Sequence, residues 1–249
     1  MHKIDTEKYI VSAREAGTEK AEDREEADRL KNYGWRNVSG PQRDEIMAYA
    51  EEYMSFLNAA KTEREAVKVI RRMAEERGFE EISKKESLKP GDRVYGVNKD
   101  KSMFLAVIGE EALTSGFHAV GAHIDAPRLD LKQNPLYEDS GFALFKTHYY
   151  GGIKKYQWTT IPLALHGVVV LTDGTKIDIC IGEDESDPVF LVTDLLPHLS
   201  AKQNVKKLAE GVPAEKLNIL LGSMPMPEAE SENVKNNILS ILKEKYGME

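Results

Sequence analysis

The chain has 249 residues, enough for one large domain or two small ones, with a hydrophobic core that needs no disulfide support. Asp and Glu total 42 against 34 Lys and Arg, so the formal net charge of -8 argues against nonspecific binding to nucleic acid or anionic lipid. The single cysteine, Cys180, excludes an intramolecular disulfide. No stretch approaches the roughly 20 apolar residues that span a bilayer, and no signal peptide is evident. We therefore expect a soluble, cytoplasmic protein.

The first third of the chain is predicted to be helical. Residues 5–32 are dense in charge, which favours exposed helices, and Ser39-Gly40-Pro41 then marks a turn. Apolar residues recur at helical spacing after this turn and predict a helix with one buried face. They are Ile46, Tyr49, Ala50, Tyr53, Phe56, Leu57 and Ala60.

A second helix is predicted to begin near Thr62. Thr62 and Glu65 have the spacing of a capping box, and Gly78 marks the end of the apolar periodicity. The expected buried stripe comprises Val67, Ile70, Met73 and Ala74.

The period of the apolar residues changes at about residue 90. The runs RVYGVN and SMFLAVIGE are short, apolar and bounded by turn residues, which predicts two strands. The run FHAVGAHID is predicted to be a buried strand whose carboxyl end carries His123 and Asp125. Because ligands of open α/β sheets tend to bind outside the carboxyl ends of strands, this position is suited to chemistry.

Residues 136–222 are predicted to be mostly β-structure. The runs KTHYYG, TIPLALHGVVVL, TKIDICIG and PVFLVTDLL are separated by turn residues, and Thr172-Asp173-Gly174-Thr175 predicts a β-hairpin. Ile177, Ile179 and Ile181 alternate with polar positions, which favours a sheet with one solvated face. Cys180 lies in this run and is interpreted as a small core residue.

A last helix is expected from about residue 231. Its apolar face would comprise Val234, Ile238, Ile241, Leu242 and Tyr246.

His123 and Asp125 form the candidate site. Residues two apart in a strand point to the same side, so both side chains would face one cavity. A neutral imidazole is a common zinc ligand, and a carboxylate can orient it by accepting its second N–H. The alternative is a structural histidine that is hydrogen-bonded at a strand end. The spacing leaves open whether Asp125 binds His123 or another group of the site.

The segment around this pair resembles a known enzyme family. The phrases HIDAPRLDLK, THYYGGIKKYQW and IPLALHG, with DLLPHLSAKQ and LNILLGSMP further on, are similar to the aspartyl aminopeptidase (vacuolar aminopeptidase I) family, in particular its bacterial branch. The resemblance extends from about residue 40 to the end of the chain and corresponds to the amino-terminal half of the family.

The resemblance implies an α/β fold: the amino-terminal part of a zinc-peptidase α/β sandwich with an inserted, β-rich dimerisation domain. On this basis we expect residues 1–130 to form the first part of the peptidase domain and residues 131–230 to form the insert. Residues 231–249 would be a helix that leads back to the peptidase domain. Homo-oligomers that assemble through the insert are also implied.

The activity that the resemblance implies is removal of amino-terminal, preferably acidic, residues from peptides with two metal ions. The metal is usually zinc, and cobalt or manganese can share such sites. Carried over by motif, His123 is a metal ligand and Asp125 is the orienting residue of the catalytic site. The family's other ligands and its glutamate base lie beyond the insert and match nothing here.

Three hypotheses about the chain follow. The first is a metallo-aminopeptidase whose missing carboxy-terminal half is supplied elsewhere, so that the chain alone is inactive. The second is a non-catalytic oligomerisation module derived from such an enzyme. The third, a single-chain enzyme that completes its site from these residues, is disfavoured because a catalytic zinc typically needs three protein ligands.

Structural interpretations are preferred for the other polar residues. His148 is interpreted as a strand residue beside a Gly-Gly turn, and His166 as a hydrogen-bonded core histidine. His198 belongs to the insert, which in the family reaches toward a neighbouring subunit's active site; a role for it there is the less favoured alternative. The remaining candidates, interpreted as solvated loop carboxylates, are Asp130, Glu138 and Asp139.

Overall fold

The computed structural model describes residues 33–227 and 232–247. The chain divides into two compact units, residues 1–57 and 58–249, and each is described by itself. The helices predicted over residues 5–32 lie outside the described residues. Within the described ranges, no helix is both long enough and apolar enough to cross a membrane.

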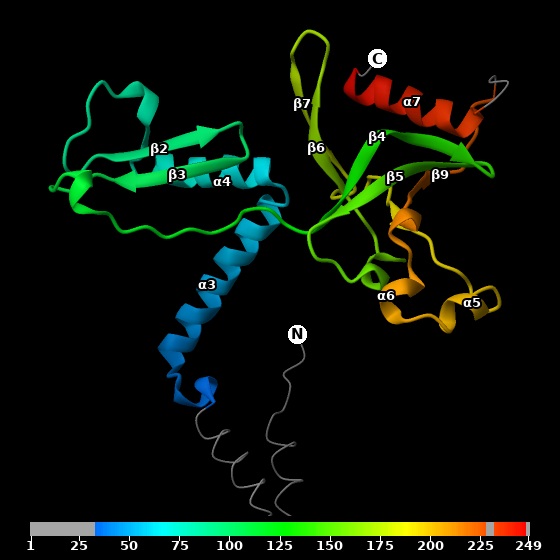
Figure 1. The fold of residues 1–249 in the computed structure, drawn as a ribbon, viewed down its shortest axis with the longest axis horizontal. Helices are drawn as coiled ribbons and strands as arrows, with labels where there is room; N and C mark the ends of the chain where they lie inside the picture. Colours follow the sequence, from blue (N-terminus) through cyan, green and yellow to red (C-terminus); the bar gives the residue numbers. More distant parts are fainter. Residues whose placement is uncertain (1–32, 228–231, 248–249) are drawn as a thin grey trace, which may run out of the picture. The chain divides into compact units, whose positions relative to one another are not determined.

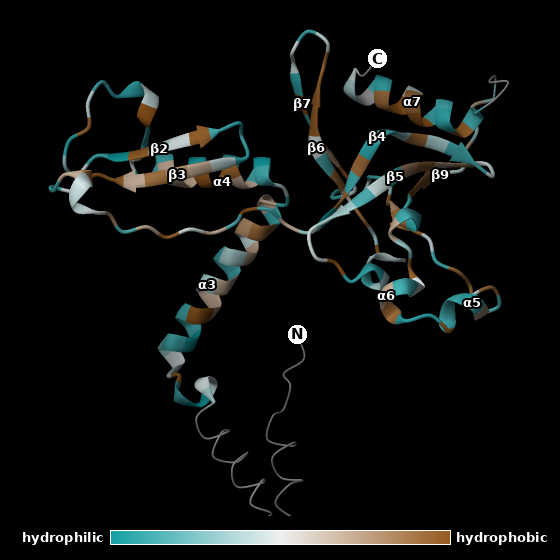
Figure 2. Cartoon of the chain, viewed as in Figure 1, coloured by the Kyte–Doolittle hydropathy of each residue, from teal (hydrophilic) through white to brown (hydrophobic). Residues whose placement is uncertain are grey.

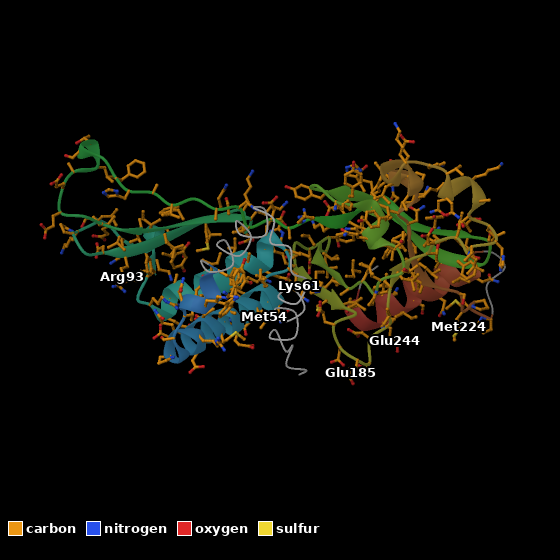
Figure 3. The ribbon with its side chains drawn as sticks, turned by 90° about the horizontal axis from the view of Figure 1, so that it is seen from below. Met54, Lys61, Arg93, Glu185, Met224 and Glu244 are labelled. Carbon is orange, nitrogen blue, oxygen red and sulfur yellow. The ribbon has the colours of Figure 1, made fainter. Side chains whose placement is uncertain are left out.

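Helix α3 (Gly40–Ala59) follows a short 3-10 helix, η1 (Gly34–Asn37), and confirms the first predicted helix. It begins at the predicted turn, where the Ser39 hydroxyl accepts the Gln42 N–H and the Gln42 side chain accepts the Ser39 N–H. None of its residues is buried, so the predicted buried face is not observed. Met54, labelled in Figure 3, is one of these exposed apolar residues. An apolar stripe is buried only where another layer covers it.

Helix α4 (Glu63–Glu76) lies against a three-stranded sheet. The sheet has the order β1-β2-β3, with β1 parallel to β2 and β2 antiparallel to β3. The capping box of Thr62 and Glu65 is confirmed, and Ala66, Val67 and Ala74 are buried. The strands and their short connection are β1 (Glu80–Glu81), η2 (Ile82–Lys84), β2 (Arg93–Asn98) and β3 (Ser102–Val107).

A second sheet has the order β4-β5-β9-β8 and is antiparallel throughout, and β6 and β7 form a separate hairpin (Figure 1). The strands of this second sheet are β4 (Arg128–Asp139), β5 (Phe142–Tyr150), β8 (Leu191–Val192) and β9 (Ile219–Gly222). The hairpin strands are β6 (Leu165–Val170) and β7 (Lys176–Ile181). The short helices are η3 (Leu113–Ser115), η4 (Lys155–Trp158), α5 (Ala201–Asn204), α6 (Leu208–Gly211) and η5 (Ala214–Lys216).

Helix α7 (Asn233–Tyr246) packs against β4, β5 and β9. One side-chain oxygen caps the amino terminus of α7: Glu138 Oε2 accepts the backbone N–H groups of Val234 and Lys235 at 2.9 and 3.0 Å. A carboxylate at the amino terminus of a helix accepts hydrogen bonds from backbone N–H groups that would otherwise be unpaired, and it complements the positive end of the helix dipole. The predicted apolar face is confirmed in part, because Val234 is buried whereas Ile241 is exposed.

The main core lies between the second sheet and the β6–β7 hairpin. Strands β6 and β9 are largely brown in Figure 2, which marks their apolar residues. The alternation predicted for β7 is confirmed, since Ile179 and Ile181 are buried. The same alternation puts Cys180 on the exposed face, so its interpretation as a core residue is wrong. The buried residues of this core are Phe145, Ile179, Ile181, Phe190, Val192, Val212, Leu217 and Ile219.

His166 joins the β6–β7 hairpin to the start of α4. Its Nδ1 lies 2.8 Å from Glu65 Oε1, and its Nε2 lies 3.0 Å from Glu183 Oε1. Lys61, labelled in Figure 3, lies 2.7 Å from the same Glu183 oxygen. The His166 side chain is only 12% exposed, so the predicted hydrogen-bonded histidine is confirmed. Its partners are carboxylates, however, and the capping-box glutamate is one of them.

Replacing His166 with Ala should therefore destabilise the fold. The change removes the hydrogen bonds of His166 to Glu65 and Glu183, and a hydrogen bond to a charged group contributes about 1.5–3 kcal/mol. Urea denaturation measures the loss. The control is Asp178→Asn, which breaks the Lys68–Asp178 pair, whose side chains are 51% and 66% exposed; it should have little measurable effect. Equal losses in the two variants would contradict the role of His166.

Tyr95 generates a pH-dependent prediction. Its hydroxyl donates to Glu75 Oε1 at 2.6 Å, and this hydrogen bond, with burial, raises the pKa of Tyr95 to about 12. An unfolded tyrosine ionises near pH 10, at about its ordinary pKa. The stabilisation from Tyr95 is therefore complete below about pH 10 and is lost as pH rises toward 12. The difference in unfolding free energy between the wild type and Tyr95→Phe should therefore become smaller as the pH rises from about 10 to about 12. A difference that stays constant over this range would contradict the role of the Tyr95 hydrogen bond.

Candidate active-site segment

The segment that carries His123 and Asp125 is not a strand. Residues 117–127 have no regular secondary structure, Phe117 is 77% exposed, and Val120 is fully exposed. The predicted buried strand is therefore wrong for the described part of the chain. A strand needs a neighbour that accepts and donates its backbone hydrogen bonds, and no described residue pairs with this segment.

His123 and Asp125 nevertheless lie together. His123 Nδ1 is 3.2 Å from Asp125 Oδ1 and 3.1 Å from the Asp125 carbonyl oxygen. Asp125 therefore contacts His123 itself, which is one of the two arrangements that the sequence left open. If Nδ1 carries the hydrogen that these oxygens accept, Nε2 keeps its lone pair for a metal. The His123 side chain is 85% exposed, so Nε2 is accessible.

Tyr150 holds the other oxygen of Asp125. Its hydroxyl donates to Asp125 Oδ2 at 3.2 Å. The pKa of Asp125 lies below its ordinary value because its own backbone N–H, and then the Tyr150 hydroxyl, stabilise the carboxylate. The same hydrogen bond raises the pKa of Tyr150. Asp125 is therefore ionised at neutral pH and bonded on both oxygens.

Arg128 supports Tyr150 from the neighbouring strand. Arg128 and Tyr150 are paired in the β4–β5 register, and the guanidinium carbon lies 4.2 Å from the centre of the Tyr150 ring. Arg128 Nε donates to Asp130 Oδ1 at 2.7 Å, and Nη1 donates to Glu63 Oε1 at 3.0 Å. Glu63 is the first residue of α4, so charged contacts connect this helix to the site.

The donors present fit one ligand position of a zinc site. His123 offers one imidazole nitrogen, and Asp125 has the orientation of a carboxylate that accepts the other ring N–H. Within residues 33–227 and 232–247, no group of three or more His, Cys, Asp or Glu side chains could hold a metal. Since a catalytic zinc typically has three protein ligands, His123 would contribute one of them.

The carboxylates expected in loops all lie in β4. Glu138 is half-buried and caps α7, as described above. Asp130 pairs with Arg128, and Asp139 accepts the Ser140 hydroxyl at 3.0 Å. Their interpretation as loop residues is wrong, because β4 was not foreseen as a strand, but Asp139 is exposed as expected. Within β4, Asn134 has a φ of +49° and is followed by Pro135. Both residues lie in an irregularity of the β4–β5 register, which interrupts the alternation of inward and outward side chains that would predict a strand.

His148 and His198 are two further histidines that the sequence singled out. His148 lies in β5 and stacks on Tyr149 with a centroid distance of 5.5 Å, so its interpretation as a strand residue is confirmed. His198 is exposed, between β8 and α5, and its role stays a prediction.

Sequence reasoning missed Tyr150 and Arg128. The sequence signal that could have pointed to Tyr150 was the Tyr-Gly-Gly of THYYGGIKKYQW, which indicates a turn directly after this tyrosine; Gly151 in this turn has a φ of +75°.

A cavity of about 560 Å³ opens next to this network. Arg128, Asp130, His166 and Glu183 line it together with apolar residues of the main core, among them Phe145. Neither His123 nor Asp125 lines it. The cavity is lined both by the start of α4, including Thr62 and Glu63, and by residues of the β-rich part, and it is not the candidate metal site.

Comparisons with known proteins agree on one family. Residues 56–249 match the family described as aminopeptidase I zinc metalloprotease (M18). A probable M18 family aminopeptidase 1 from Clostridium acetobutylicum is 49% identical over 226 residues, which cover 88% of this chain and 49% of that protein. The crystal structure of an M18 aminopeptidase from Thermotoga maritima superposes with a TM-score of 0.80 at 45% identity, covering 86% of this chain and 46% of that one.

A more distant structure, the S. cerevisiae mApe1 dodecamer, shares the fold at 17% identity, with a TM-score of 0.58 over 81% of this chain and 45% of that one. The chain spans about half the length of the relatives that it matches. The mixed α/β fold and the family resemblance predicted from the motifs are confirmed. The chain belongs to the M18 family of zinc metallo-aminopeptidases.

Proposed function

We propose that this chain supplies the amino-terminal part of a zinc-dependent aminopeptidase active site, with His123 as a metal ligand and Asp125 as its orienting residue. The observation that carries the proposal is the His123–Asp125 contact at 3.2 Å, which leaves Nε2 exposed, in a chain that belongs to the M18 family. Peptides are the substrates, and acidic amino-terminal residues are the preferred ones.

Zinc would polarise the scissile carbonyl and lower the pKa of a bound water. The residues of this chain prepare one ligand for it. The ionised Asp125 accepts the Nδ1–H of His123, fixes the tautomer and makes Nε2 a stronger donor. We propose two zinc ions in the assembled site, with cobalt or manganese able to replace them, because hard and borderline donors bind all three metals.

The remaining ligands and the general base would come from a carboxy-terminal half. Support comes from the donor set, since the described residues bring one imidazole to the site where typically three ligands are needed. On this proposal the 249-residue chain is inactive by itself. The β-rich residues 131–230 would be an inserted domain, between the peptidase residues 1–130 and the helix over 231–249, through which copies of the chain associate.

The direct test compares the chain alone with the chain combined with the carboxy-terminal half of its Clostridium acetobutylicum relative. Zinc content and hydrolysis of amino-terminal Glu, Asp and Leu amides are measured. The combination should bind zinc and hydrolyse the acidic substrates, and the chain alone should do neither. Two tightly bound zinc ions with hydrolysis by the chain alone would contradict the need for a second half. Assembly without zinc or hydrolysis would favour a non-catalytic oligomerisation module.

The proposed residues are tested in the same assembly. His123→Ala removes a ligand and should abolish zinc binding at that position, whereas Asp125→Asn should weaken zinc binding by about 10–100-fold. His118→Ala is the matched control, because His118 is an exposed histidine of the same segment. Its zinc content and kcat/KM should equal those of the wild type. Equal zinc content in the His123→Ala and His118→Ala variants would contradict the assignment.

A further inference from the structure

We infer that Tyr150 is a positioning residue for the metal site: it holds Asp125 so that His123 presents Nε2, and Arg128 in turn holds Tyr150. The inference rests on the proposed roles of His123 and Asp125. The Tyr150 hydroxyl donates to Asp125 Oδ2 at 3.2 Å, while Asp125 Oδ1 lies 3.2 Å from His123 Nδ1. With Oδ2 occupied by Tyr150, Oδ1 is the oxygen that remains for the imidazole.

The segment around Asp125 needs such a support. Within residues 33–227 and 232–247, nothing pairs with residues 117–127 as a strand, so no sheet hydrogen bond from the described residues fixes the orientation of Asp125. Side chains from the adjacent sheet reach it instead. Tyr150 binds the Asp125 carboxylate, and Arg128 Nη1 contacts the Ala126 carbonyl oxygen at 3.4 Å. A carboxylate free to rotate would offer the ring no preferred direction.

Tyr150 itself is held in place. It is the last residue of β5 and pairs with Arg128, the first residue of β4. Arg128 is bound on two sides by Asp130 and Glu63, which fixes its guanidinium over the Tyr150 ring. After Tyr150 the chain turns at Gly151, with a φ of +75°, and a Cβ there would lie 3.5 Å from Pro127 Cα. This is an ordinary van der Waals distance, and it shows that the end of β5 lies beside the segment.

Tyr150→Phe tests the inference because it keeps the ring on Arg128 and removes the hydroxyl. Tyr150 is 40% exposed, so the ring can stay in place in the folded chain. Two-bond ¹H–¹⁵N spectra of the zinc-free full chain, at a pH where the ring is neutral, report the tautomer of His123. The ratio of Nδ1–H to Nε2–H forms should fall by about two- to tenfold, the effect of one lost hydrogen bond. Tyr156→Phe, at 38% exposure, is the matched control and should leave the ratio unchanged.

A double-mutant cycle separates action through Asp125 from other effects. If Tyr150 acts by holding Asp125, Tyr150→Phe should change nothing further in an Asp125→Asn background. An unchanged ratio in Tyr150→Phe, or the same change in both backgrounds, would overturn the inference.

Zinc affinity of the assembled enzyme gives the second readout. Tyr150→Phe should weaken zinc binding by about 10–100-fold, the range found for groups that orient ligands, while Tyr156→Phe should not weaken it. A tautomer shift without a change in zinc affinity would also overturn the inference. The proposed function fails on a different result, namely unchanged zinc content when His123 is replaced with Ala. The two failures are therefore distinguishable.

Discussion

The candidate site depends on the contacts that the guanidinium of Arg128 makes with four neighbouring residues. This guanidinium connects α4 through Glu63, β4 through Asp130 and β5 through the ring of Tyr150, and it touches the carbonyl of Ala126. A planar group with five donors and a polarisable face can make all these contacts at once, and a lysine could not. The position of Asp125 relative to the sheet follows from this junction.

The junction also shows how one cluster of charges serves both fold and site. Helix α4 begins at a capping box whose Glu65 contacts His166 of β6, and the preceding residue pair, Glu63 and Arg64, binds Arg128 and Asp100. Local helix capping and the placement of the β-rich part are thereby coupled. The loss of one charge in this cluster would leave others unpaired, which costs more than the loss of an exposed pair.

Prediction from sequence succeeded where the pattern is local. The capping box at Thr62, the hairpin at Gly174 and the alternation of β7 all depend on near neighbours in the chain, and all are confirmed. It failed for residues 117–127, where apolar composition indicated a buried strand although no described residue pairs with them. The motif around His123 identified the family, but Tyr150 and Arg128 contact the site only through the β4–β5 register, which depends on pairing between strands. No periodicity within one strand contains that information.

The central claim is that His123 binds zinc through Nε2 while its Nδ1 faces Asp125. The most direct measurement is a crystal structure of the zinc-loaded assembly, with data collected on both sides of the zinc absorption edge. The account predicts an anomalous peak about 2.0–2.1 Å from His123 Nε2, the usual zinc–imidazole distance, with Asp125 still at Nδ1. Zinc bound elsewhere, or bound to Nδ1 with Asp125 displaced, would contradict it.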